Sequence, residues 1–354
     1  MLNYGNDNSS ALEAKFKAQK IAFAPIMFQA ARALRNLGIL ELLMKERKGL
    51  TTELIAERLQ IQVYGVKVLL EAGLSMEIVR VENNQWFLTK TGYFLQYDEL
   101  TRVNMDFTHD VNYLGMFHLE ESIRQGKPAG LKVFGEWDTV YEGLFELPED
   151  ALKSWLGFDH FYSDYAFPEL MPIVFKNKPA HIMDVGGNTG KFALECVAFN
   201  SGVKVTIVDL PGQVVKAAEA IRRKGFADRI NTVATNLLDH SVALPKGADI
   251  IWMSQFLDCF SQADVLSLLI RAKEAMQTDS RLFILETYWD KQEFEASTYS
   301  LHATSLYFTC IANGCSQMYH SGDLLKLIGE AGLEVDESFE NVGVSHTLLT
   351  CKIK

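Results

Sequence analysis

Short apolar runs alternate with amphipathic stretches from residue 178 onward. The runs are HIMDV (181–185), KVTIVDL (204–210), DIIWM (249–253) and RLFILET (281–287). Strands of this length separated by helical stretches are typical of a parallel sheet with helices on both faces. The final stretch, residues 333–354, is expected to close the sheet as an antiparallel hairpin. The pattern therefore predicts an α/β fold with a doubly wound, mostly parallel sheet.

The first hundred residues follow a different pattern, with apolar positions at helical spacing. Residues 23–44 predict an amphipathic helix, because apolar side chains recur every three to four positions, at Phe23, Met27, Ala30, Leu34 and Leu37. Residues 50–76 predict a short helix, a turn and a second helix. Residues 76–92 predict two strands around the turn Asn83-Asn84. A helix-turn-helix followed by such a hairpin is a winged helix.

A winged helix either reads DNA or serves as a packing module. Reading DNA requires basic or amide side chains on the outer face of the second helix, here roughly residues 62–76. That segment offers only Gln62 and Lys67, opposed by Glu71, among mostly apolar residues. We therefore expect the module to pair with a second subunit, and we assign residues 1–105 to a dimerisation domain. Residues 106–354 then contain a helical, aromatic-rich linker followed by the sheet.

Composition and charge narrow the classes of partner. The 354-residue chain is 48% hydrophobic and carries a formal net charge of -11, as a globular acidic protein does. An acidic surface repels phosphate, so we expect no binding to nucleic acid or to a membrane surface. The polar first residues and the lack of an 18-residue apolar run predict neither a secretory signal nor a membrane span. Five scattered cysteines without Cys-x-x-Cys predict reduced thiols, a cytoplasmic location and no metal site.

The first strand of the sheet runs into a glycine-rich turn, DVGGNTG at 184–190. Its spacing differs from the G-x-G-x-x-G that holds a dinucleotide pyrophosphate, which argues against an NAD-linked dehydrogenase. Asp184 at the strand end would repel a phosphate and attract a cation. Asp209, at the end of the next strand, can accept hydrogen bonds from both hydroxyls of a ribose. A cationic ligand with a ribose and no phosphate fits both acids, and S-adenosylmethionine has that description.

These motifs resemble those of a known family. DVGGNTG with VDLP at 208–211, together with HLEESIRQGKPAG at 118–130, is similar to the class I methyltransferases, and more narrowly to the plant-type and hydroxyindole-type small-molecule O-methyltransferases. The resemblance covers most of the chain. It implies a Rossmann-like methyltransferase fold, an intertwined homodimer and metal-independent methyl transfer to a small molecule. The cofactor site that we expect on this basis comprises Asp184, Gly186, Gly187, Gly190, Asp209, Leu210, Asn236, Leu237 and Ser254.

The segment after the third strand departs from the family pattern. Relatives usually carry a Gly-Asp-Met-Phe-like segment there, which holds the adenine end of the cofactor. This chain has Thr235, Asn236, Leu237 and Leu238 at the matching positions. Asn236 can still form hydrogen bonds and Leu237 can still pack on a ring. We therefore expect weaker charge at this end of the site, with binding retained.

A second departure concerns the catalytic base. After the fourth strand the family usually has Leu-His-Asp-Trp, whose His removes the proton from the acceptor hydroxyl. This chain has Leu257, Asp258, Cys259 and Phe260 there, so Asp258 stands at the position of the base. Relatives often have a Glu near position 318, where this chain has Met318. Glu286, at the end of the next strand, lies where another family acid can sit.

Three accounts of the chemistry follow from this replacement. Asp258 can act as the base if burial raises its pKa, or it can only cap a helix that begins near Ser261. His302 in YSLHATSLYF can supply the base from a neighbouring helix, or it can be a core histidine, with His320 and His109 as weaker candidates. In the third account, the protein binds the cofactor and performs changed chemistry or acts as a regulator.

Aromatic residues supply candidates for the acceptor pocket. Each of them alone is better explained as core, but the resemblance favours a planar aromatic acceptor held among several of them. The residues are Phe158, Tyr162, Trp252, Tyr307 and Phe308, and His302 is a further candidate for contact with the acceptor. We predict methyl transfer from S-adenosylmethionine to a hydroxyl of a small aromatic molecule, with Asp258, His302 and Glu286 as catalytic candidates.

Overall fold

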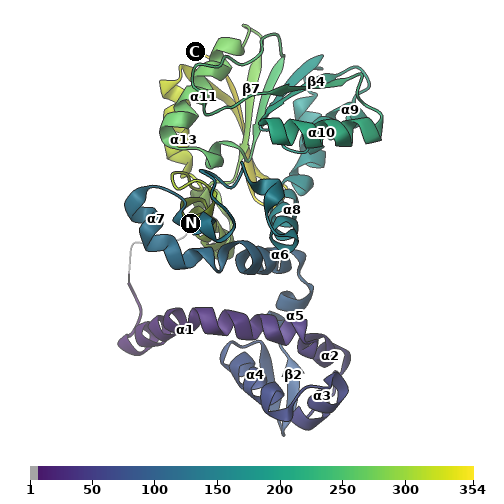
Figure 1. Ribbon diagram of the computed structural model, residues 1–354, viewed down its shortest axis with the longest axis vertical. Coiled ribbons are helices and arrows are strands. Elements are labelled where there is room, and N and C mark those ends of the chain that lie inside the picture. Colours follow the sequence, from purple (N-terminus) through teal and green to yellow (C-terminus); the bar gives the residue numbers. More distant parts are fainter. Residues whose placement is uncertain (1–6) are drawn as a thin grey trace. The chain divides into compact units, whose positions relative to one another are not determined.

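A computed structural model describes residues 7–354, apart from the side chain of Asp164. The chain divides into two compact units, Met1–Thr108 and His109–Lys354 (Figure 1). No helix among the described residues is long and apolar enough to cross a membrane.

The first unit is mainly helical, as predicted. Its elements are α1 (Ala11–Asn36), α2 (Ile39–Lys45), α3 (Thr52–Leu59), α4 (Val63–Ser75), β1 (Val79–Glu82), β2 (Gln85–Leu88), α5 (Lys90–Tyr97) and α6 (Glu99–Phe107). β1 and β2 form the expected antiparallel hairpin. Asn83 and Asn84 both have left-handed backbone angles, with φ of 49° and 59°, as a two-residue turn between twisted strands requires. Leu34, Ile55 and Leu70 lie in the buried core of this unit.

The helical spacing over residues 23–44 is confirmed, but this segment spans the end of one helix and most of a second. α1 begins at Ala11, where Ser10 and Glu13 form a capping box, and it ends at Asn36. Gly38 has a left-handed φ of 79° and separates α1 from α2. Phe23 and Leu37 are 54% and 45% exposed, whereas Leu34 is fully buried. The apolar residues of this segment therefore lie on two faces. One face, with Leu34, packs inside the unit, and the other, with Phe23, is exposed.

The second unit starts with a helical layer and continues into the sheet. The layer contains η1 (Thr108–Asn112), η2 (Gly115–His118), α7 (Leu119–Gln125), η3 (Ala129–Val133), η4 (Leu144–Glu146) and α8 (Glu149–Val174). The sheet region contains β3 (His181–Val185), α9 (Lys191–Phe199), β4 (Lys204–Asp209), α10 (Pro211–Lys224), β5 (Ile230–Ala234), β6 (Ile250–Ser254), η5 (Leu257–Cys259), α11 (Gln262–Ala275), β7 (Arg281–Glu286), η6 (Trp289–Lys291), α12 (Glu295–Tyr307), η7 (Phe308–Ala312), α13 (Ser321–Glu330), β8 (Leu333–Val342) and β9 (His346–Ile353).

The sheet has seven strands in the order β5-β4-β3-β6-β7-β9-β8. The first five of these are parallel, and β9 runs antiparallel to both β7 and β8, so the closing hairpin is confirmed. α9 and α10 cover one face, and α11 and α13 cover the other (Figure 1). The predicted doubly wound α/β fold is therefore confirmed. The strand order reverses between β3 and β6, and ligands of such sheets bind beyond the carboxyl ends of the strands at that point.

Two cores hold the carboxyl ends of β3 and β6 in place. On one face, the ring of Trp252 in β6 stacks on Phe192 of α9, with centroids 4.0 Å apart. On the other face, Met253 packs with buried residues of α11 and α13 such as Leu268 and Leu324. Trp252 is fully buried, so its alternative role in an acceptor pocket is replaced by a role in the core. The strands therefore form a rigid frame for the loops that follow them.

Candidate active site

The glycine turn after β3 leaves no room for side chains. Gly186 has a left-handed φ of 76°, and a Cβ there would lie 2.2 Å from the ring of Phe256. A Cβ on Gly187 would lie 2.6 Å from Oδ2 of Asp184. Gly190, with φ of 81°, is the residue that precedes α9. The turn therefore brings bare backbone close to the end of β3, as a closely bound ligand requires.

Asp184 is a buried carboxyl group beneath this turn. It is 2% exposed, and its Oδ2 has no hydrogen-bond partner among the described residues. Burial, with a smaller effect from the charge of Asp209, raises the pKa of Asp184 to about 8. An unpartnered buried carboxyl oxygen is costly unless a ligand completes it. The site therefore suits a ligand that brings a positive charge or a hydrogen-bond donor.

Asp209 ends β4, the strand next to β3. Its Oδ2 accepts a hydrogen bond from the backbone N–H of Asn188 at 2.7 Å, and its Oδ1 accepts one from that of Leu210 at 2.6 Å. Burial raises the pKa of Asp209 to about 6, although both hydrogen bonds act in the opposite direction. A carboxylate has about four lone-pair positions, so Asp209 keeps capacity for two further donors. That capacity is what the two hydroxyls of a ribose require.

The loop after β5 carries the residues expected at the adenine end. Asn236 is exposed, and its Oδ1 accepts a hydrogen bond from the backbone of Leu238 at 3.1 Å. Leu237 is buried in the core that contains β6 and α11. At the end of β6, Ser254 has a buried Oγ without a hydrogen-bond partner among the described residues. Their contacts with a cofactor remain predictions.

Arg271 of α11 fixes this loop, and nothing in the sequence pointed to it. Its guanidinium donates to the carbonyl oxygens of Leu237 at 2.6 Å, Val242 at 3.1 Å and Asp239 at 3.2 Å. We expect Arg271→Met to lower the free energy of unfolding by about 2–4 kcal/mol, because buried carbonyl acceptors lose their donor. Chemical denaturation checks this value. Arg223→Met is the control, since Arg223 is exposed in the last turn of α10. Equal losses in both variants would contradict the assignment.

Asp258 and Glu286 form a second carboxyl pair. Asp258 follows β6, and Glu286 ends β7. Oε1 of Glu286 accepts hydrogen bonds from the backbone N–H groups of Phe256 at 3.0 Å and Leu257 at 2.8 Å. These bonds hold η5, which carries Asp258, a residue that is 5% exposed. Burial and the charge of Asp159 raise the pKa of Asp258 to about 7. Burial and the charge of Asp258 raise the pKa of Glu286 well above its usual range.

The alternative in which Asp258 caps the following helix is wrong. α11 is capped by Ser261, whose Oγ accepts a hydrogen bond from the backbone N–H of Asp264 at 3.2 Å. Asp258 lies three residues earlier and is buried. Its polar contact with Cys259, at 3.5 Å between Oδ1 and Sγ, is a weak one. A buried carboxyl without a capping role is more typical of a reactive group.

The histidine candidates lie on other contacts. His302 is exposed on α12, and its ring lies 5.0 Å from that of Trp289, so the expectation of a core histidine was wrong. His320 caps α13 and also lies 5.0 Å from Trp289. Nδ1 of His109 lies 2.7 Å from Asp110. A catalytic role for His302 remains a prediction.

The aromatic residues predicted for the acceptor pocket come from three elements, and Tyr307 lies near Asp258. The rings of Phe158 and Tyr162 on α8 lie 5.2 Å apart, and those of Tyr307 and Phe308 lie 5.3 Å apart. Trp155 of α8 donates a hydrogen bond to the hydroxyl of Tyr307 at 2.6 Å. The charges of Asp159 and Asp258 both raise the pKa of Tyr307, after the larger effect of burial. Tyr307 therefore lies near Asp258 and is joined to α8 through Trp155.

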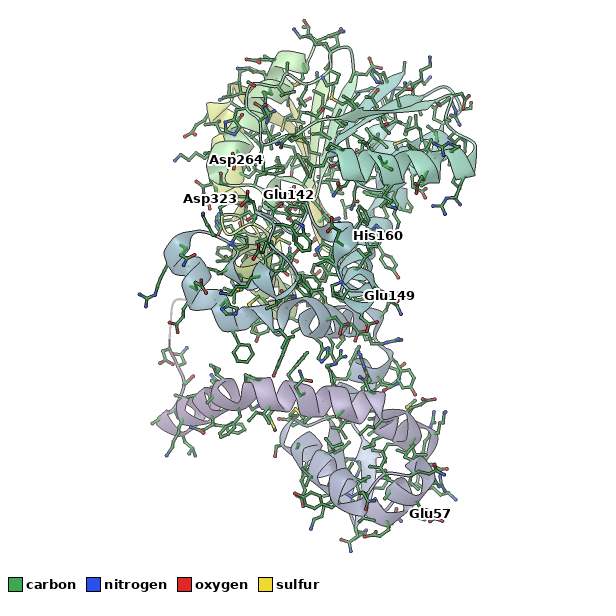
Figure 2. All side chains as sticks on the ribbon, viewed as in Figure 1. Glu57, Glu142, Glu149, His160, Asp264 and Asp323 are labelled. Atoms are coloured by element: carbon green, nitrogen blue, oxygen red, sulfur yellow. The ribbon has the colours of Figure 1, made fainter. Side chains whose placement is uncertain are left out.

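Tyr141 is a further group that sequence reasoning missed. Its hydroxyl is buried beside the thiol of Cys259. Burial and the neighbouring Cys259 and Tyr307 raise the pKa of Tyr141, and the charge of Asp258 acts in the same direction. Tyr141 therefore lies near Asp258. The next residue, Glu142, lies near one end of the sheet in Figure 2. Asp264, in the first turn of α11, lies near the same end. The linker therefore supplies a hydroxyl near Cys259 and Asp258, which follow β6.

The raised carboxyl pKa values predict how stability depends on pH. Folded-state pKa values of about 8 for Asp184, 6 for Asp209 and 7 for Asp258 lie above the unfolded value near 3.8. The stabilisation from keeping these groups neutral is complete below pH about 4 and is lost as the pH rises towards 8. His346, whose pKa burial lowers to about 4, acts in the opposite direction only between pH 4 and 6.5.

We therefore expect the ligand-free protein to melt at a lower temperature at pH 8.5 than at pH 6.5. Thermal melts across this range check the sign. Asp184→Asn, which stays neutral, is expected to flatten the curve above pH 7. A melting temperature that rises with pH would contradict the buried, neutral state of these acids.

Comparison with known proteins agrees with the two-part organisation of the chain. Residues 15–86 match the model of the Dimerisation2-like domain, and residues 170–334 match that of the O-methyltransferase domain. Acetylserotonin O-methyltransferase of Gallus gallus is 27% identical over 210 residues, which span 55% of this chain and 58% of that enzyme. The alignment thus covers less than two thirds of that relative.

Solved structures show the same fold over nearly the whole chain. The S-adenosylmethionine-dependent methyltransferase SibL has a TM-score of 0.72 and 23% identity, over 95% of this chain and 98% of SibL. The O-methyltransferase NcsB1, in complex with S-adenosylmethionine and 2-hydroxy-5-methyl naphthoic acid, has a TM-score of 0.64 and 19% identity, over 92% of this chain and 96% of NcsB1. The two domain matches lead to one conclusion: the chain combines a Dimerisation2-like domain with an O-methyltransferase domain that follows it.

Proposed function

We propose that the protein transfers a methyl group from S-adenosylmethionine to a hydroxyl of a small aromatic molecule. The observation that carries the proposal is the pairing of two acid sites at one sheet edge. One is Asp184 with Asp209 around the glycine turn, and the other is Asp258 with Glu286 at the adjacent strands. The relatives support it, since they include O-methyltransferases that are named for the acceptors acetylserotonin and a hydroxynaphthoate.

The residues present fit S-adenosylmethionine. Gly186 and Gly187 leave space against the end of β3, Asp184 offers an unpartnered buried oxygen, and Asp209 retains free acceptor capacity. A positive charge beside Asp184 stabilises the ionised carboxylate, whereas a phosphate there would be repelled. When bound, the cofactor supplies a methyl group activated on a positively charged sulfur that leaves readily.

Asp258 would accept the proton of the acceptor hydroxyl. A carboxylate with a pKa near 4 is a weak base towards a phenol with a pKa of about 10. The raised pKa of about 7 narrows this gap by about 3 units, which corresponds to about 4 kcal/mol. Glu286 would position the acid through its two backbone hydrogen bonds. The surrounding aromatic rings would exclude water and align the acceptor. Alignment of the reacting groups supplies much of the rate in such reactions.

Methyl-labelled S-adenosylmethionine tests the proposed function. The protein would be incubated with it and with a panel of phenols, catechols, hydroxyindoles and hydroxynaphthoates. Label in an acceptor extract that depends on the protein supports the proposal. Binding of S-adenosylhomocysteine without transfer to any acceptor, including those in an extract of the native cell, would instead favour changed chemistry or a regulatory role.

We also propose a homodimer formed through the first domain. α1 carries an apolar stripe of Leu12, Phe16, Phe23 and Ile26, which are 79%, 57%, 54% and 66% exposed within one subunit. A helix that exposes such a stripe in water is typical of an interface. The reduced state of the five cysteines supports a cytoplasmic location, which we propose with it. Lys67 of α4 faces Glu71 at 3.9 Å, which supports leaving nucleic acid out of the partners.

Light scattering checks the proposed dimer. We expect the wild-type protein to have twice the subunit mass of 39.9 kDa. The double variant Phe16→Glu/Ile26→Glu is expected to shift towards the mass of one subunit, because charges would be buried in the interface. Ala14→Glu, on the opposite side of α1, is the control and should leave the mass unchanged. A wild-type mass of one subunit would contradict the dimer.

A further inference from the structure

Asn188, in the glycine turn, contacts acids of two different elements. Its backbone N–H donates to Asp209 Oδ2 at 2.7 Å, and its side-chain Nδ2 donates to Asp159 Oδ2 at 3.2 Å. Asp209 belongs to the proposed cofactor site, whereas Asp159 belongs to α8. One residue therefore bridges the cofactor turn and the helix that contributes Phe158 and Tyr162.

The side chain of Asn188 is not needed to build the turn. Its φ of 47° is left-handed, a conformation that glycine adopts without strain. Its Oδ1 is buried without a hydrogen-bond partner among the described residues, which is a cost that glycine would avoid. Because glycine would fit the turn and avoid this cost, the side chain of Asn188 is best explained by the contact that its Nδ2 makes. That contact is Asp159.

Asp159 lies on the inner side of α8. Trp155, four residues earlier, and Tyr162, three residues later, share its helix face and are both buried. Trp155 holds the hydroxyl of Tyr307 at 2.6 Å. The charge of Asp159 also raises the pKa of Asp258, so this carboxyl lies near the reaction acid. The position of Asp159 therefore sets the position of the α8 face that lines the expected acceptor pocket.

We propose that Asn188 is a positioning residue that couples the cofactor site to the acceptor pocket. A ligand that binds Asp209 fixes the turn, and Nδ2 of Asn188 then fixes Asp159 and the 155–163 segment of α8. The cofactor consequently increases the affinity for the acceptor, and by linkage the acceptor increases the affinity for the cofactor by the same factor. This inference rests on the proposed function, because it requires the cofactor at Asp209.

Hydrogen exchange with S-adenosylhomocysteine as the probe tests the coupling. In the wild-type protein the probe should slow exchange at the glycine turn, and it should slow exchange in residues 155–163 by about tenfold. In Asn188→Gly and Asp159→Ala the turn should still be protected, but the protection of residues 155–163 should fall below about twofold. Asp159→Asn keeps an oxygen that accepts from Asn188, so it should retain the protection.

Two comparisons make the result decisive. Asn341→Gly makes the same substitution at another left-handed position, with φ of 58°, in β8, and it should behave as the wild type. Unchanged protection of residues 155–163 in Asn188→Gly would overturn the coupling while leaving the proposed function intact. A wild-type protein whose glycine turn gains no protection from the probe would refute the cofactor site itself, and the coupling with it.

Discussion

Asp258→Asn is expected to lower kcat by about 10²–10⁴-fold, the range of a lost general base. Asparagine keeps the size of the side chain but cannot accept the proton at neutral pH. The affinity for S-adenosylhomocysteine should change by less than about threefold, because Asp258 follows β6 while the glycine turn follows β3. Steady-state kinetics with the best acceptor of the panel, together with calorimetric titration, separate the two quantities.

The pH dependence of kcat gives a second criterion for Asp258. A base must be ionised to work, so the wild-type rate should rise with pH through about 7, where Asp258 titrates. This rise should be lost in Asp258→Asn. His302→Gln is the control and should keep both rate and profile, since His302 is exposed on α12. If His302→Gln abolishes turnover and Asp258→Asn does not, the base has been assigned to the wrong residue.

Gly186→Ala is expected to weaken the binding of S-adenosylhomocysteine by at least about 100-fold. The new Cβ would lie 2.2 Å from the ring of Phe256. The backbone of residue 186 also has a left-handed φ of 76°, which alanine rarely adopts. The turn and Phe256 must move apart to relieve this overlap, and both flank the proposed cofactor site. A displacement of this kind removes the close approach of backbone and ligand that the site requires.

Gly225→Ala separates the two causes of this loss. Gly225 ends α10 with a nearly equal φ of 79°, but a Cβ there would meet no atom within 4 Å. Both variants pay the cost of a left-handed alanine, about 1–2 kcal/mol of stability. Only Gly186→Ala adds the overlap with Phe256. Unchanged ligand affinity in Gly186→Ala would show that the cofactor binds elsewhere.

The strands that bury both faces were predictable from the sequence, and the edge strand was not. The runs at β3, β4, β6 and β7 are continuous and apolar because helices cover both sides of the sheet. β5 carries Asn231 and Thr232 and exposes three of its five residues, so no apolar run marked it. The apolar periodicity marks the first helical segment only from residue 23 onward, whereas the start of α1 is marked by the capping box of Ser10 and Glu13.

The acids at the strand ends were predictable because parallel strands bring their carboxyl ends to one edge. The residues that fix those acids were not predictable. Asn188, Asp159 and Tyr141 act through contacts between segments far apart in the chain, and Arg271 acts through backbone carbonyls that carry no sequence signal. Tertiary packing decides these contacts. The charge of Asp258 was visible, but its burial, which makes it a suitable base, came only from the fold.

The atom that receives the methyl group tests the account most directly. S-adenosylmethionine labelled with ¹³C on its methyl group would be turned over with the acceptor that the panel identifies, and the product would be examined by carbon NMR. Our account predicts a single methoxy resonance that is absent when the protein is omitted. A label that appears on nitrogen or carbon, or that stays on the cofactor while the cofactor is bound, would contradict it.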